Sequence, residues 1–392
     1  MKTSVKRRPF GNTGLMVSEV SFGAMNIRNL KTSGQAMEIL DFVLDQGINL
    51  IDTARAYVGV NGSGETIVSE EFVGRAIAAR DDIDEPIVIV TKGHAYNPAS
   101  FDADFNASIK ALGVKKTDQG LFIGNTEIKL VYFFHGIKED RWAEVKSSGA
   151  IDHALKRQAA GDFTYLGFSS HYGDGKEIKE ALDTGVFQVI ELPYNVFNRS
   201  LSEDGAFDFI KYAHDMGIAI VNMKAFNGNG MVPTAKIIGD VCSITYPQML
   251  RFCLSNPYIS TVDAGAKYPA EFQTDINASL SSPMGDDERT ALKAEADKVS
   301  AMLNDICREC MHCLEKFKCP QGINFPDILG IHARYSISRE LGKATDDFSS
   351  QYQAICGPLA DACISCGECS TWCEYHLDIP PMMESAHRDL SA

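Results

Sequence analysis

Four side chains that could together move a proton to or from a carbonyl oxygen stand at or just after the ends of three apolar runs. They are Asp52, Tyr57, Lys92 and His135. A phenol is a weak acid at neutral pH, and a nearby ammonium group lowers its pKa. We therefore expect Lys92 to lower the pKa of Tyr57, and Asp52 to keep Lys92 in place and protonated. With His135 donating a hydrogen bond to the same oxygen, the set is suited to interconverting a carbonyl and an alcohol when a hydride comes from elsewhere.

These side chains meet only if the apolar runs are neighbouring parallel strands, whose carboxyl ends lie at one mouth of a barrel. Taken singly, Asp52 could cap a helix, and Tyr57 and His135 could pack in a core. The runs are apolar at nearly every position, as in strands buried on both faces, and they alternate with segments of helical spacing. Eight such runs predict a (β/α)8 TIM barrel, preceded by a β-hairpin over residues 5–22. The predicted strands are 20–22, 49–51, 87–90, 130–134, 165–168, 189–192, 218–221 and 259–262, and the predicted helices are 33–46, 64–80, 98–112, 147–160, 174–184 and 202–216.

The composition is that of a globular protein with more than one domain. The chain has 392 residues, 45% hydrophobic and 23% charged, which allows about two or three domains. Its formal charge of −15 and pI near 5.1 argue against a nucleic acid or an anionic membrane surface as a partner. No apolar run reaches the roughly 18 residues of a membrane helix, and the basic start lacks the apolar stretch of a secretory signal. We therefore expect a cytoplasmic protein without membrane insertion.

The segments that hold the four side chains resemble the motifs of the aldo-keto reductases. The similar segments are Gly47–Tyr57, Val90–Lys92, Phe134–Gly136, Phe10–Ser18 and Thr261–Gly265. The resemblance covers about residues 5–280, with the motifs in the family's order. It implies a (β/α)8 barrel that binds NADPH or NADH in an extended form, without a Rossmann domain, and a small carbonyl or alcohol substrate. It also implies that the four side chains form the catalytic set, with Tyr57 as the general acid/base.

The same resemblance implies where a nicotinamide cofactor would be held, with departures from the family's pattern. Ser170 replaces the usual Asn, and Met223 stands in place of a stacking Tyr. Asp275 occupies the position of an Asn near the adenosine. Because a 2′-phosphate is bound by cations, only Lys267 favours NADPH, and NADH stays open. The implied cofactor positions are Ser169, Ser170, Gln188, Met223, Lys224, Gly265, Lys267 and Asp275.

Nine of the 11 cysteines are crowded between Cys307 and Cys373. Crowded thiols in a chain without an export signal indicate metal binding rather than disulfides. The cysteines form two groups of three, with two residues between successive cysteines, and each group is followed by a fourth cysteine. This is the spacing of two-cluster ferredoxins, in which the fourth cysteine of each run binds the other cluster. All-thiolate zinc sites are the alternative, but their cysteines more often occur as pairs separated by two residues. The predicted 4Fe-4S ligands are Cys307, Cys310, Cys313 and Cys373 for one cluster, and Cys363, Cys366, Cys369 and Cys319 for the other.

The chain is thus predicted to consist of a barrel domain over residues 1–284 and a mostly α-helical ferredoxin-like domain over residues 285–392. Cys356 is expected to be a bystander. A barrel with such a tail resembles a subgroup of the aldo-keto reductases. Exposed 4Fe-4S clusters are sensitive to oxygen, so an anaerobic setting is expected.

A hydride carries two electrons, whereas each cluster transfers one, and no flavin motif is visible that could convert between the two. How the barrel and the clusters work together therefore stays open, and three functions are compatible with the sequence. The first is an NAD(P)H-dependent carbonyl reductase whose clusters are structural or dock an electron-transfer protein. The second is a redox enzyme in which the clusters feed single electrons to a substrate in the barrel. The third is a non-enzymatic electron-transfer subunit, against which the intact set of four side chains argues.

Overall fold

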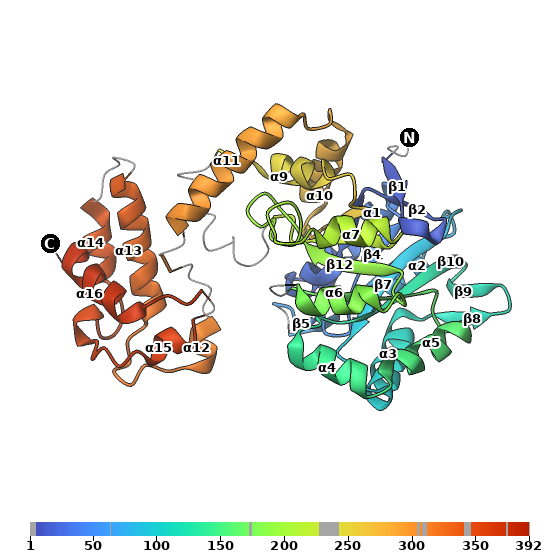
Figure 1. Cartoon of the computed structure of the whole chain (residues 1–392), viewed down its shortest axis with the longest axis horizontal. Coiled ribbons are helices and arrows are strands. Elements are labelled where there is room, and N and C mark those ends of the chain that lie inside the picture. Colours follow the sequence, from blue (N-terminus) through green and yellow to red (C-terminus); the bar gives the residue numbers. More distant parts are fainter. Residues whose placement is uncertain are drawn as a thin grey trace. The chain divides into compact units, whose positions relative to one another are not determined.

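Eight parallel strands close into a barrel in the computed structural model, as the sequence predicts (Figure 1). Each strand pairs with the next one along the chain, and the last pairs with the first. The strands are nearly all apolar because strands of a parallel barrel are covered by side chains on both faces. They are β3 (Val20–Gly23), β4 (Leu50–Asp52), β7 (Ile87–Gly93), β10 (Thr126–Phe134), β11 (Tyr165–Ser169), β12 (Val189–Pro193), β13 (Ala219–Met223) and β14 (Thr261–Ala264).

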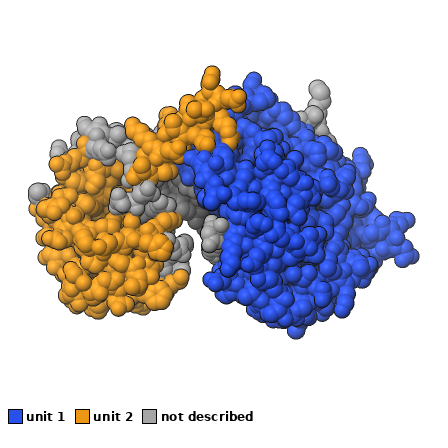
Figure 2. Space-filling view, viewed as in Figure 1, with its two compact units in different colours: residues 1–225, 246–285 blue, residues 226–245, 286–392 orange. Residues whose placement is uncertain are grey.

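The structure describes residues 5–62, 64–171, 175–226, 243–303, 306–307, 312–340, 346–373 and 375–391. The chain divides into two compact units (Figure 2). One comprises Met1–Ala225 and Tyr246–Gly285, and contains the barrel; the other comprises Phe226–Thr245 and Asp286–Ala392, and is helical. The two units are described separately below.

Helices follow the barrel strands, and most of them lie where the helical spacing predicts. The helix α3 shows why one of them begins where it does, because Asn97 accepts a hydrogen bond from the backbone of Ser100 and forms a capping box with it. The helices of this unit are α1 (Ser33–Asp45), α2 (Ser69–Ala78), α3 (Pro98–Leu112), α4 (Glu139–Ser147), α5 (Ala150–Ala159), α6 (Lys176–Asp183), α7 (Phe209–Asp215), α9 (Tyr246–Leu254) and α10 (Pro269–Leu280).

Three helix predictions are wrong in their bounds. The predicted helix 202–216 begins only at Phe209, the first residue of α7. The predicted helix 64–80 begins only at Ser69, because the preceding residues form a hairpin of β5 (Val58–Val60) and β6 (Thr66–Val68). Gly59 in this hairpin lies so close to the backbone carbonyl of Arg28 that a Cβ would clash with it. The predicted helix 147–160 is split from α4 by Gly149, whose φ of 80° is left-handed.

Two further hairpins lie at the end of the barrel where its strands begin. The first consists of β1 (Arg7–Pro9) and β2 (Met16–Ser18), and the connecting segment places the fully buried Phe10 against the apolar barrel interior. The second consists of β8 (Lys115–Thr117) and β9 (Gly120–Ile123), which extend the sheet at the start of β10. Figure 1 shows this hairpin projecting from the barrel. Both precede the strands that they adjoin, so they lie away from the strand ends that carry the chemistry.

The helical unit is built around α13, α14 and α16, which pack on one another (Figure 1). Its core contains the buried side chains Ile328, Leu329, Tyr352 and Met383. The Tyr352 hydroxyl is 2.9 Å from His387 Nδ1 and accepts a hydrogen bond from the backbone of Ala360. The helices are α11 (Asp286–Leu303), α12 (His312–Lys316), α13 (Phe325–Glu340), α14 (Asp346–Gln353), α15 (Glu368–Thr371) and α16 (Ile379–Leu390). Among the residues described, no helix combines the length and apolar character that crossing a bilayer requires.

Candidate active site

The polar site is formed by inward-facing side chains of the same strands whose other inward-facing side chains fill the barrel. Residues two apart on a strand share a face. The apolar interior of the barrel includes the inward-facing side chains Leu50, Val90, Phe133, Val189 and Val221. Two residues further on, the same strands and the loop after β10 place polar or soft side chains at the mouth of the barrel. In the same order these are Asp52, Lys92, His135, Glu191 and Met223. The mouth is thus a mostly polar layer resting on an apolar one.

Lys92 lies at the centre of this layer and is 1% exposed. Its ammonium contacts the carboxylate of Asp52, donates to the Thr53 carbonyl at 3.2 Å and lies 3.3 Å from Glu191 Oε2. Burial alone would lower the pKa of Lys92, but the neighbouring carboxylates raise it well above its ordinary value. The predicted pairing of Lys92 with Asp52 is present, and the ammonium keeps its charge at neutral pH.

Two carboxylates of the mouth are absent from the sequence prediction. Oxygens of Asp52, Glu191 and Asp263 all lie within 4.8 Å of one another. Ser21 donates to Asp263 Oδ1 at 3.3 Å, and a Cβ on Gly23 would lie 2.6 Å from Asp263 Oδ2. Burial and the charge of Glu191 raise the pKa of Asp263 to about 7. Lys92 therefore faces more carboxylates than it can neutralise, and Asp263 is partly protonated near neutral pH.

Tyr57 lies beside Lys92 and His135. Its ring centroid is 5.4 Å from Lys92 Nζ and 6.2 Å from the His135 ring centroid, with the two rings nearly perpendicular. Lys92 lowers the pKa of Tyr57, as the sequence predicts, but burial raises it more, and the carboxylates of Asp52, Glu191 and Asp263 raise it further. The expected net lowering is therefore wrong: the pKa lies above its ordinary value. The phenol is protonated at neutral pH and can act as a proton donor.

His135 is a neutral imidazole at the same mouth. Burial and the positive charge of Lys92 lower its pKa to about 2. The ring stacks on His94 at 4.3 Å between centroids, and its Nδ1 is buried without a hydrogen-bond partner among the described residues. The Tyr96 hydroxyl donates to the His135 carbonyl at 2.8 Å, which holds the backbone at this position. A buried, neutral ring with an unpaired nitrogen is suited to hydrogen bonding with an incoming polar group.

Ser169 and Ser170 lie next to His135, but their hydroxyls are already engaged. Ser169 Oγ accepts a hydrogen bond from the backbone of Gly136 at 3.0 Å, and Ser170 Oγ donates to the Ile137 carbonyl at 2.9 Å. Both side chains are buried. They hold the loop that follows His135, and a cofactor amide would have to share these hydroxyls.

Gln188 is an implied cofactor residue that the structure places away from the mouth. It precedes β12, and its side-chain oxygen accepts from the Leu166 backbone and from Gln158 on α5, both at 3.0 Å. Its amide nitrogen donates to the Val186 carbonyl at 2.7 Å. Gln188 thus faces the surrounding helices, whereas Glu191, three residues further on, faces the mouth. The position of Glu191 near the carboxyl end of its strand, rather than similarity to a motif, identifies it as a residue of the mouth.

The remaining implied cofactor positions follow β13 and β14. Met223 is buried at the end of β13, and the exposed Lys224 after it has a positive φ of 58°. The Gly265 carbonyl accepts a hydrogen bond from Asn26 at 2.7 Å. Lys267 is exposed just before α10, and Asp275 is buried on that helix, where burial and Glu271 raise its pKa to about 7.

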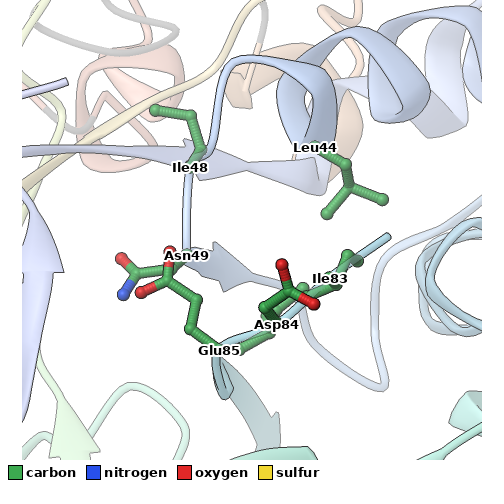
Figure 3. A pocket seen from close by; sticks show the side chains of 7 residues that line it. Leu44, Ile48, Asn49, Ile83, Asp84 and Glu85 are labelled. Atoms are coloured by element: carbon green, nitrogen blue, oxygen red, sulfur yellow. The ribbon is translucent and has the colours of Figure 1, made fainter. Parts of the chain in front are cut away.

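A cavity of about 210 Å³ in the barrel unit belongs to the opposite end of the strands (Figure 3). Asn49 stands just before β4 and Ile87 begins β7, so the cavity lies where these strands start. Glu85, which lines it, forms an ion pair with Arg7 of β1. The cavity therefore has no part in the chemistry of the mouth. Its lining residues are Leu44, Ile48, Asn49, Ile83, Asp84, Glu85 and Ile87.

The cysteines of both predicted runs gather around one core in the helical unit. Cys313 belongs to this core, and the thiols packed against it are Cys307, Cys319, Cys363, Cys369 and Cys373. Cys366 is exposed, and Cys310 lies outside the described residues. Burial and the proximity of Cys363 and Cys366 raise the pKa of the Cys369 thiol to about 11. Thiols from residues more than 50 positions apart in the sequence thus surround a single small core.

Known proteins resemble the barrel unit. The sequence matches the Aldo/keto reductase family over residues 19–245. A 6-dehydroglucose reductase of Novosphingobium aromaticivorans is 31% identical over 106 residues, which are 27% of this chain and 34% of that protein. The uncharacterized oxidoreductase YrpG of Bacillus subtilis is 27% identical over 225 residues, 56% of this chain and 65% of that protein. The chain thus matches less than two thirds of the length of each of these two relatives.

The fold agrees with that of a solved aldo-keto reductase of Bacillus halodurans in its holo form. The two superpose with a TM-score of 0.58 at 22% identity, over 74% of this chain and 96% of the other. At this identity the similarity concerns the fold alone. The family match, however, covers more than half of the 392 residues. The chain therefore belongs to the aldo/keto reductase family.

Proposed function

We propose that this enzyme interconverts a small carbonyl compound and its alcohol, with Tyr57 as the general acid/base. The observation that carries the proposal is the mouth itself, where a protonated phenol and a neutral imidazole flank a buried ammonium. In reduction, the carbonyl oxygen accepts hydrogen bonds from Tyr57 and His135, and Tyr57 gives it a proton. Lys92 stabilises the phenolate that Tyr57 leaves behind, and Asp52 and Glu191 fix the ammonium in place.

A reduced nicotinamide, when bound, supplies the hydride. The proposed binding residues are Ser169, Ser170, Met223, Lys224, Gly265, Lys267 and Asp275. The unpaired Nδ1 of His135 supports a ligand at the mouth, because buried polar atoms rarely lack a partner. Gln188 is left out because its polar atoms are used at the outer face of β12.

Titration of anaerobically purified protein with NADH and NADPH tests this proposal. A micromolar fluorescence or calorimetric signal is expected for at least one of them. If NADPH is the cofactor, Lys267→Ala should weaken its binding about tenfold to a hundredfold, because a cation that meets a phosphate contributes roughly 1.5–3 kcal/mol. NADH binding should stay within about twofold. Lys110→Ala on the outer helix α3, also an exposed lysine, is the matched control. Equal weakening of both nucleotides by Lys267→Ala would contradict a role in holding the 2′-phosphate.

The reduction rate is expected to fall as the pH rises through about 7. Asp263 is uncharged below its pKa of about 7 and negative above it, and its charge raises the pKa of Tyr57. A phenol of higher pKa is a weaker proton donor, so kcat should decrease about threefold between pH 6 and pH 8. The charges of Glu191 and Lys92 and the hydrogen bond from Ser21 all act on Asp263, so the midpoint of the profile depends on these neighbours as well. In Asp263→Asn the decrease should disappear; a pH profile of kcat that keeps its shape in the variant would contradict this role.

For the helical unit we propose two 4Fe-4S clusters. The packing of six of the predicted ligand cysteines around one core supports the proposal, and so does the proximity of Cys363, Cys366 and Cys369. Thiols this close together are held as thiolates when a metal centre neutralises them. The clusters either stabilise the unit or dock an electron-transfer protein. Iron and sulfide analysis of anaerobic protein tests this, and zinc in place of iron would contradict it.

A second function is favoured by the occupied hydroxyls of Ser169 and Ser170. Ser170 already donates its hydroxyl proton within the loop, and Ser169 already accepts a hydrogen bond there, so fewer free hydrogen-bonding groups remain for a nicotinamide. The clusters would then deliver single electrons to a substrate in the barrel, with Tyr57 still moving the proton. Absence of nucleotide binding in protein with intact clusters would favour this function over the first.

A further inference from the structure

Two arginines stand at the mouth of the barrel, Arg28 beside Tyr57 and Arg141 beside the loop that follows His135. Arg28 lies in the segment after β3, and its Cζ is 5.9 Å from the centroid of the Tyr57 ring. Arg141 lies in the first turn of α4, after β10; its Nη1 donates to the Gly136 carbonyl at 2.8 Å. Both come from segments that follow carboxyl ends of strands, where the active sites of such barrels lie.

Neither arginine has a carboxylate partner among the residues that the structure describes. Arg28 has only the face of Tyr57, and Arg141 has the Gly136 carbonyl and the face of Tyr96, 5.6 Å away. In a chain with 52 acidic and 37 basic residues, unpaired arginines are unexpected. Most arginines elsewhere in the barrel unit do pair with acids, namely Arg7, Arg8, Arg55, Arg80, Arg157 and Arg199.

Other groups at the mouth do not replace this positive charge. Lys92 is already engaged by Asp52 and Glu191. His94 and His135 are held neutral, because burial and neighbouring cations, Arg141 among them, lower the pKa of each. Both arginines are half-buried and keep their charge at any physiological pH. Among the described residues, these two guanidinium groups thus bring positive charge without a carboxylate partner to the mouth.

The local packing fixes the backbone of Arg28 and the guanidinium group of Arg141. The backbone of Arg28 packs against Gly59 of the β5–β6 hairpin, where a Cβ would clash with the Arg28 carbonyl. Tyr96, over which Arg141 lies, also holds the His135 carbonyl by its 2.8 Å hydrogen bond. Guanidinium groups that are preorganised beside a reacting centre are suited to planar anions such as carboxylate and phosphate.

Resting on the function proposed above, we infer that the substrate is a carbonyl compound that carries an anionic group, held by Arg28 and Arg141. In its reduction the carbonyl carbon gains a hydride from the reduced nicotinamide, which becomes oxidised. The carbonyl oxygen gains the proton of Tyr57, which solvent then replaces. The anionic group undergoes no chemistry; it orients the carbonyl towards Tyr57 and His135.

Matched pairs of aldehydes test this inference and separate the two kinds of anion. Succinic semialdehyde is compared with butanal for a carboxylate, and glyceraldehyde 3-phosphate with glyceraldehyde for a phosphate. The wild-type enzyme is expected to have a kcat/KM at least tenfold higher for the charged member of one pair. Arg28→Met and Arg141→Met should each lower that value about tenfold to a hundredfold, because a charge-assisted hydrogen bond is lost. The uncharged member should change by less than about twofold, and Arg28→Lys should recover part of the loss.

Arg75→Met is the matched control, because Arg75 also lies over a ring, that of Phe72 at 4.9 Å, but on the helix α2. It should leave both members of each pair unchanged. A wild-type enzyme without preference within either pair, or equal losses for both members in the arginine variants, would overturn the inference while leaving the proposed function standing. Weaker NADPH binding in the variants with substrate preference unchanged would also overturn it, since the arginines would then hold the cofactor.

Calorimetric titration with succinate and with inorganic phosphate gives a readout that does not depend on turnover. One of the two anions should bind to the wild-type protein and to Arg75→Met, and should bind at least tenfold more weakly to Arg28→Met and Arg141→Met. If the anion binds in this way but no aldehyde is reduced with either nucleotide, the proposed function fails and the anion site stands. If neither anion binds, the inference fails.

Discussion

Tyr57→Phe is expected to lower kcat for carbonyl reduction by about a thousandfold, and to leave nucleotide binding within about twofold. Proton donation by a positioned side chain contributes roughly 10²–10⁴ in rate. The substitution removes only the hydroxyl, so the ring still packs beside His135 and Lys92. Because burial and three carboxylates raise the pKa of Tyr57, the phenol stays protonated well above neutral pH. The wild-type rate should therefore not be limited by loss of this proton between pH 6 and pH 9.

Tyr165→Phe is the matched control for this substitution. The Tyr165 hydroxyl donates to the Thr13 carbonyl at 3.3 Å, at the end of the barrel where the strands begin. Loss of this bond should leave kcat within about twofold, because it lies away from the mouth. If Tyr57→Phe kept more than a tenth of the wild-type kcat, the proton would have to come from another group, and the assignment of Tyr57 as the acid would be wrong.

The four side chains of the sequence prediction are predictable because each follows a short apolar run, and the carboxyl ends of parallel strands meet at one mouth. Glu191 lies inside the predicted strand 189–192, whereas Asp263 directly follows the predicted strand 259–262 and so obeys the same rule. Finding Glu191 requires the inward and outward alternation of its strand, which the nearly apolar sequence of a buried strand conceals.

Gln188 illustrates the opposite error. A resemblance by motif assigns it to the cofactor site, but a shift of one residue along a strand moves a side chain to the other face. Val189 faces the barrel interior and Gln188 faces the helix α5, as its bond to Gln158 shows. Local sequence similarity near the start of a strand does not fix which face a residue occupies; the register with the neighbouring strands does.

The pKa of Tyr57 could not be predicted from its nearest cation because it depends on the whole mouth. Lys92 lowers the pKa of Tyr57 as expected, but Glu191 and Asp263 come from strands more than 130 residues beyond Tyr57 in the chain. Burial, together with the charges of these carboxylates, reverses the net direction of the pKa shift. Electrostatics at a buried site depends on every charge that the fold brings there, and the sequence order of those charges gives no guide to their proximity.

The helical unit is expected to lose its fold when its iron is removed. Six of the predicted ligand cysteines belong to or pack against its core, so the clusters, when bound, would take part in that core. When ligands are brought together only by the metal, the binding free energy becomes folding free energy. Chelation of the iron should therefore abolish the cooperative unfolding transition of this unit, measured by circular dichroism and differential scanning calorimetry. The transition of the barrel unit, which has its own apolar interior, should remain.

Cys366→Ala and Cys356→Ala form a matched pair that locates the iron, because both thiols are exposed and the substitution is the same. Cys366→Ala is expected to remove about half the iron and sulfide, since it removes one ligand of one of two clusters. Cys356→Ala should retain the full content, as a bystander would. Carbonyl reduction with a nicotinamide should continue in both variants if the clusters are structural.

If Cys366→Ala instead stops turnover while nucleotide binding persists, the clusters supply the electrons and the second of the two proposed functions is correct. If Cys366→Ala and Cys356→Ala lose iron equally, or if neither does, the ligand assignment drawn from the cysteine spacing is wrong.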